Sequence, residues 1–225
     1  MRKIMESKKL GKRYVLSSVW MLMLMMLVPQ TFSQSGDSLQ ERARRSEGGY
    51  IAYKEVNFGA IHLNLNGLIK QSNQVLIGTV LSNHCRLTTD ERSINTLYKI
   101  RVDEVLKGAL SNDRIVEVSL PGGYLSFNND THAEVRVTGG FRKLLDGRQY
   151  VLFLDDTIEN GVFLSTGEAQ GLFELRKDNR ILPADMRPEH PLVKTYKESK
   201  GEDFLKAIRE AVKKESAGSS VNDNQ

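Results

Sequence analysis

Cysteine is almost missing from this chain of 225 residues, which contains one, Cys85, together with four histidines and one tryptophan. A single cysteine excludes an intramolecular disulfide, so the fold has to be held by its hydrophobic core. The histidines are scattered, and the sequence lacks the paired Cys and His spacings of a zinc site. We therefore predict neither a metal site nor a bound cofactor.

Recognisable catalytic motifs are also missing. The sequence has no G-x-S-x-G elbow, P-loop, H-E-x-x-H or G-x-G-x-x-G. His84 and Cys85 are adjacent, but neighbours on an extended strand point to opposite faces and are unsuited to act as base and nucleophile. Asp155 and Asp156, with Glu159 nearby, lack the ordered spacing of a calcium loop and indicate a solvated acidic hairpin. We assign no catalytic residue.

The first 33 residues have the pattern of an export signal. A basic stretch from Arg2 to Arg13 leads to an apolar run from Val19 to Val28 and then to Thr-Phe-Ser, after which, at Ser33, we expect cleavage. The apolar run is shorter than the roughly 18 residues that a spanning helix needs, which favours a cleaved signal over an uncleaved anchor. Cys85 does not follow the cleavage point, as a lipoprotein's cysteine would. We predict an exported protein, periplasmic or extracellular, without a transmembrane span after cleavage.

The net charge of +4 is carried mostly by this leader. Its six basic residues and one glutamate amount to +5, so the cleaved chain carries about −1. The basic balance is thus no sign of a nucleic-acid partner, which we do not expect.

Four segments are expected along the chain: a signal peptide at 1–33, a polar linker at 34–59, a folded domain at 60–214 and a disordered tail at 215–225. The linker is rich in charged residues and buries little apolar surface by itself. The alternative for it is a short helix docked on the domain. The length left after cleavage suits a single domain.

Alternation of apolar and polar residues with a period of two predicts a mostly β domain. The run Tyr150 to Leu154 is apolar throughout, so we expect it at the centre of the sheet, covered on both faces. The other predicted strands are Gln74 to Val80, Tyr98 to Leu106 with a bulge near Asp103 to Val105, Val116 to Leu120, Ala133 to Thr138, Gly161 to Ser165 and Gln170 to Arg176.

Two helices are expected beside the strands. A short helix carries Leu65, Leu68 and Ile69 on one face. A C-terminal helix follows a capping box of Ser199 and Glu202. Its apolar stripe consists of Phe204, Ile208, Ala211 and Val212. We expect this stripe to pack on the strands, and a partner-binding helix is the alternative.

Three short motifs occur in order between about Gln74 and Leu175. They are a V-x-G-x-V type strand at 75–80, a V-L-K-G strand end at 105–108 and a G-x-x-Y-V-L-F-L strand at 147–154. In this order they resemble netrin-like and tissue-inhibitor-of-metalloproteinase domains and a group of poorly characterised exported bacterial proteins. The resemblance implies an OB-like barrel of five or six strands, and it concerns fold rather than function. The inhibitors' zinc-chelating N-terminal cysteine and disulfides have no counterpart here, so protease inhibition does not carry over.

We favour a non-enzymatic binding or interaction module with an unknown protein or glycan partner. OB-type barrels bind through a strand face and its loops, and the long irregular segments Arg86 to Asn95 and Gly122 to Asp130 are the expected binding edge. Tyr124 and Phe127 are the candidate binding residues, with packing of the loop on the barrel as the alternative.

Two other classes of function stay open. A secreted enzyme with loop-borne catalytic residues would be indicated by a close pair of buried carboxylates with raised pKa values in a cleft. An envelope assembly factor that pairs through a sheet edge would be indicated by an open strand edge.

Overall fold

A computed structural model describes residues 36–46, 49–55, 64–110, 114–128, 130–155 and 161–219. The predicted signal peptide and its cleavage point lie outside these residues. The described residues from Asp37 onward fall in one compact unit. This unit is mostly β, as the alternation predicted, with two sheets and accompanying helices. None of its described helices is long and apolar enough to cross a membrane.

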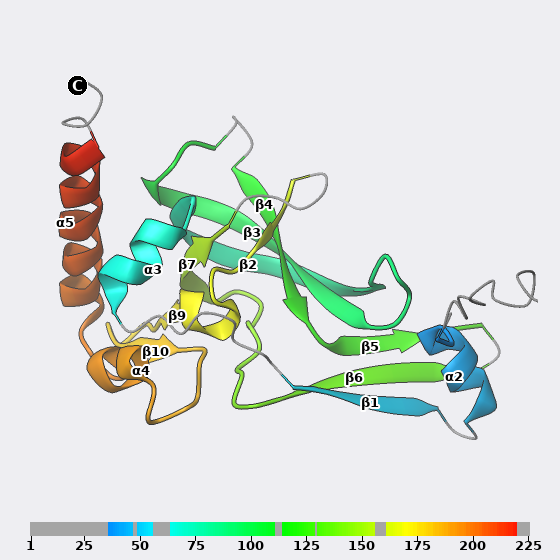
Figure 1. The fold of residues 1–225 in the computed structure, drawn as a ribbon. Helices are drawn as coiled ribbons and strands as arrows, with labels where there is room; N and C mark the ends of the chain where they lie inside the picture. The colour runs from blue at the N-terminus through cyan, green and yellow to red at the C-terminus, as the bar shows by residue number, and fades with distance from the viewer. Residues whose placement is uncertain are drawn as a thin grey trace, which may run out of the picture. The chain divides into compact units, whose positions relative to one another are not determined.

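Seven strands form the larger sheet. They are β2 (Gln74–Leu87), β3 (Ile94–Lys107), β4 (Ile115–Pro121), β7 (Gln149–Leu154), β8 (Val162–Leu164), β9 (Leu172–Leu175) and β10 (Ile181–Pro183). Their order is β10-β9-β7-β2-β3-β4-β8, and all neighbours are antiparallel except β4 and β8 (Figure 1). The bulge predicted near Asp103 to Val105 is confirmed. Ile77 pairs with Glu104 and the next residue of β2, Gly78, pairs with Val102, so Asp103 is the extra residue on β3.

The larger sheet is not closed into a barrel. Its edge strands are β10 and β8, and in the described part of the chain a single isolated bridge joins Leu154, at the end of β7, to Ser165, directly after β8. The expected OB-like closure is therefore not confirmed. The physical reason is that β8 has only three residues, too few to pair along the length of β7.

Both faces of the larger sheet are buried around β7 and the first half of β2, whereas alternate side chains of β3 between 99 and 103 are exposed. On one face, Leu76 of β2 and Leu152 of β7 belong to a core cluster that also includes side chains of β3 and β4. On the other face, Val75 and Phe153 pack with three helices. β7 is thus covered on both sides, as its apolar run predicted, although β2 takes the middle place in the strand order.

The helices on the second face are α3 (Leu65–Gln71), α4 (Pro191–Tyr196) and α5 (Gly201–Ser219). Both predicted helices are confirmed, and Ile69 of α3 and Phe204 of α5 are buried in the same cluster. The predicted capping box of Ser199 and Glu202 is wrong, because the Ser199 hydroxyl donates to the Thr195 carbonyl and the helix begins at Gly201. α5 also continues to Ser219, into the tail predicted over 215–225.

The smaller sheet has three strands, β1 (Tyr50–Glu55), β5 (Gly123–Ser126) and β6 (His132–Thr138), in the order β1-β6-β5 (Figure 1). β1 is parallel to β6, and β5 is antiparallel to it. The chain passes from β4 into this sheet through Gly122 and Gly123, whose φ angles are 91° and 146°. Thr96 of β3 donates its hydroxyl to the Gly122 carbonyl, which fixes the passage against the β2–β3 hairpin.

The segment predicted as a linker, 34–59, is folded where the structure describes it. Ser38 and Glu41 form a capping box at the start of α2 (Leu39–Arg45), with side-chain hydrogen bonds of 3.2 and 2.9 Å. Leu39 and Ala43 of this helix are fully buried against residues of β3 and β6. For this part of the segment the docked-helix alternative is the correct one, because α2 buries Leu39 and Ala43 against strands far along the sequence.

Candidate functional site

β1 is an edge strand with one unpaired side. It pairs with β6 from Tyr50 to Glu55, and no other described strand pairs with its opposite side (Figure 1). An edge strand presents N–H and C=O groups that can bond to a strand of another chain. β1 contains no proline, and its Ile51 and Tyr53 side chains are 45% and 67% exposed. Among the described residues, the strand therefore combines main-chain groups without a strand partner on one side with accessible apolar side chains.

Ile51 and Tyr53 lie on the exposed face of the smaller sheet. In the pairing register Ile51 is opposite Glu134 and Tyr53 is opposite Arg136. The Arg136 guanidinium donates to the Glu134 carboxylate at 2.8 Å, and this hydrogen bond lowers the pKa of Glu134 and raises the pKa of Arg136. The face thus presents apolar side chains along β1 beside an ion pair on β6.

Tyr124, a predicted binding residue, belongs to this same face. It pairs in register with Glu134, its side chain is 52% exposed, and its ring centroid lies 5.4 Å from that of His132. Phe127 lies elsewhere: it is half-buried and packs against the cluster that includes Leu39 and Ala133. The structure therefore separates the two residues, with Tyr124 accessible and Phe127 packed on the fold.

The two segments expected to be irregular are strand only in part. In the first, residues 86–87 end β2, residues 88–93 form the turn of the hairpin, and residues 94–95 begin β3. In the second, β5 takes up Gly123–Ser126. Within the hairpin His84 is exposed, whereas Cys85 is half-buried with its Sγ 3.5 Å from Thr96 Oγ1. Cys85 thus packs as a small side chain, and neighbouring His84 is a surface residue.

Acidic side chains do not gather with His or Cys into a group that could hold a metal ion in the described part of the chain. Asp155 accepts a hydrogen bond from Thr166 at 2.7 Å, and the other two residues of the predicted acidic hairpin lie outside the described residues. Buried Asp185 binds Arg187 through two hydrogen bonds of 2.6 and 2.9 Å. Glu168 is the one described carboxyl group whose pKa is raised, by burial. A close pair of such carboxylates is thus not found among these residues.

Sequence reasoning missed Ile51 and Tyr53, because they fall in the segment predicted as a linker. The available signal was the run of four apolar residues from Tyr50 to Tyr53 inside an otherwise polar stretch. Comparison with protein-family models found no match to this chain, and comparison with curated proteins found none either.

Proposed function

We propose that this protein is an exported, non-enzymatic interaction module that binds an extended segment of a partner protein as an added strand on β1. The observation that carries the proposal is the unpaired outer side of β1 among the described residues, together with exposed Ile51 and Tyr53. In strand addition, main-chain hydrogen bonds supply affinity and alternate side chains supply specificity. Export is supported by the leader pattern of the first 33 residues.

The larger sheet serves in this proposal as an OB-type scaffold that is partly open. Three features support such an arrangement: β2, β3 and β4 form an antiparallel meander, β7 returns beside β2, and β8 runs parallel to β4. The Asp155 N–H also donates to the Leu164 carbonyl at 2.9 Å, which joins the end of β7 to β8. OB-type barrels are often left partly open in this way.

The chemistry of the exposed face indicates which partner strand fits. Aromatic and β-branched side chains that face each other across two strands stabilise the pair by about 0.2–1 kcal/mol each. Ile51 and Tyr53 therefore favour a partner segment with apolar residues at alternate positions. A segment of high β-propensity with few charges meets this requirement.

The test is affinity capture with the purified protein as bait in an extract of the host's extracellular and periplasmic fractions. The edge variant carries Ile51→Lys and Tyr53→Lys, since lysines on an edge strand oppose strand addition. The matched control carries Leu145→Lys and Met186→Lys, which are both 52% exposed and lie outside β1. We expect one protein partner to bind the wild type and the control, and to bind the edge variant roughly tenfold more weakly, equivalent to about 1.4 kcal/mol.

Three results would overturn the proposal. The first is equal retention of the partner by all three proteins. The second is retention of glycans or small molecules with no protein. The third is self-association of the wild type that the edge variant abolishes, because the occupant of the edge would then be a second copy of this chain.

A further inference from the structure

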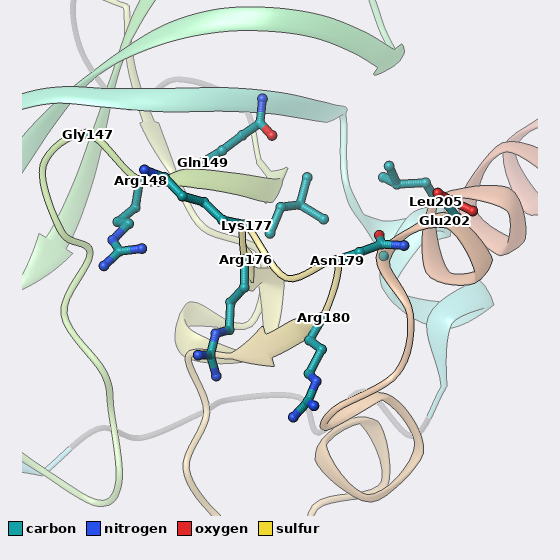
Figure 2. A pocket seen from close by; sticks show the side chains of 11 residues that line it. Gly147, Arg148, Gln149, Arg176, Lys177, Asn179, Arg180, Glu202 and Leu205 are labelled. Atoms are coloured by element: carbon teal, nitrogen blue, oxygen red, sulfur yellow. The ribbon is translucent and has the colours of Figure 1, made fainter.

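A pocket of about 370 Å³ lies away from β1, between three segments that are distant in the sequence (Figure 2). The segments are 147–149 at the start of β7, 175–180 at the turn between β9 and β10, and 201–205 at the start of α5. The volume falls in the range of small-molecule sites, which is about 300–1,000 Å³. The pocket is therefore large enough for a small organic molecule.

Most of the charged residues that line this pocket are basic. Arg148, Arg176, Lys177 and Arg180 are among its residues, and Glu202 is the single acidic one. In Figure 2 the three arginine side chains extend in the same direction from their separate positions. Each of these side chains is about half exposed.

Neighbouring carboxylates pair with all three arginines. The Arg180 guanidinium donates to the Glu198 carboxylate at 3.0 Å, whereas the ion pairs of Arg148 and Arg176 are longer. Arg148 lies 3.9 Å from Glu174, and Arg176 lies 3.6 Å from Asp178. These ion pairs are too long to be hydrogen bonds. Since a guanidinium presents five N–H donors in a planar fork, both groups retain donors that fit an oxyanion.

The backbone that carries these side chains is fixed by hydrogen bonds. The Arg176 N–H donates to the Arg180 carbonyl at 2.9 Å, and the Asn179 N–H donates to the Arg176 carbonyl at 3.0 Å. The Gly201 N–H donates to the Asn179 carbonyl at 2.8 Å, which joins the start of α5 to the turn. A site ordered in advance in this way loses less conformational entropy when a ligand binds.

We propose that this pocket binds a small organic anion with two or more oxyanion groups, carboxylate or phosphate. Arg148 and Arg176 bind the oxyanions through paired charge-assisted hydrogen bonds. The carbon skeleton of the ligand lies against Leu175 and Leu205, the apolar residues of the lining. This site does not depend on strand addition at β1, so either proposal can fail without the other.

Calorimetric titration of the purified protein with citrate and with 3-phosphoglycerate tests the proposal, with sodium chloride at matched ionic strength as the reference. The pocket variant carries Arg148→Gln and Arg176→Gln. The control carries Arg209→Gln and Lys213→Gln, which remove the same charge from exposed positions of α5 outside the lining. We expect saturable binding of at least one probe, weakened at least about tenfold in the pocket variant and unchanged in the control.

Absence of binding above the salt reference would overturn the proposal. An equal loss of affinity in both variants would also overturn it, because the binding would then reflect overall charge. Inorganic phosphate serves as a further probe. If it bound as tightly as the organic anions, the assignment to a ligand with a carbon skeleton and several oxyanions would be wrong.

Discussion

Gly123 is the residue on which the passage between the two sheets depends. Its φ is 146°, and an added Cβ would lie 2.6 Å from Cys85 Sγ and 2.9 Å from Thr96 Oγ1. We predict that Gly123→Ala lowers the free energy of unfolding by about 2–4 kcal/mol, through backbone strain and overpacking, as measured by urea denaturation. The control is Gly67→Ala in α3, where the added Cβ would contact only Asn64, at 3.5 Å. This change should raise the free energy of unfolding by about 0.5–1 kcal/mol. Similar effects of the two changes would contradict this role of Gly123.

Tyr98 makes stability depend on pH in the alkaline range. Burial raises the pKa of its phenol from 10.0 to about 12. The unfolded chain loses this proton near pH 10, whereas the folded chain keeps it to about pH 12. The contribution of Tyr98 to the free energy of unfolding is therefore complete below pH 10 and is lost as the pH rises to 12. We predict a decrease of about 2–3 kcal/mol in the free energy of unfolding over this window.

The matching variant for this prediction is Tyr98→Phe, measured by urea denaturation at several pH values between 9 and 12. The decrease should be smaller in the variant but still present, because burial also raises the pKa values of Tyr150 and Tyr196. An alkaline decrease of equal size in the variant and the wild type would show that Tyr98 does not cause it.

Among the elements, α5 is the one whose role as a cover for the larger sheet is most readily tested. Phe204 is buried, and its ring centroid lies 4.8 Å from the rings of both Phe173 and Tyr196. We predict that Phe204→Ala lowers the free energy of unfolding by about 3–5 kcal/mol. Lys206→Ala on the exposed side of the same helix should change it by no more than about 0.5 kcal/mol. A small effect of the Phe204 change, measured by thermal or urea denaturation, would instead favour a partner-binding helix.

Elements whose apolar pattern is regular within a short window were predictable from the sequence. This applies to α3, α5 and the run of β7, because burial on one or both faces leaves a periodic trace. β1 was not predicted. α2 was expected only as the alternative to a linker, since Leu39 and Ala43 are buried by residues such as Ala133, some ninety positions later. The capping box of Ser38 and Glu41 was the local sign of this helix.

The candidate site was predictable only in part. Tyr124 and Phe127 are aromatic residues three positions apart, and the sequence does not show that one lies on the exposed face of a strand and the other against the core. That difference follows from the tight passage at Gly122 and Gly123, which starts β5. The anion pocket could not be predicted, because folding brings its three segments together.

For the molecule as a whole, the two sheets have different surroundings. The larger sheet is buried on both faces around β7 and the first half of β2, and this part suits a rigid scaffold. The smaller sheet is buried on one face only, and it leaves the other face and the side of β1 accessible among the described residues. Binding sites commonly lie on accessible segments that a rigid scaffold positions. This division supports the proposal that partners are bound at β1.

Residue-resolved hydrogen exchange of the protein, with and without the captured partner, tests strand addition most directly. If the partner adds a strand to β1, the outward-facing amides between Tyr50 and Glu55 should exchange at least about tenfold more slowly in the complex, while those of α5 remain unchanged. Unchanged exchange throughout Tyr50–Glu55, with slower exchange elsewhere in the molecule, would show that the partner binds another surface.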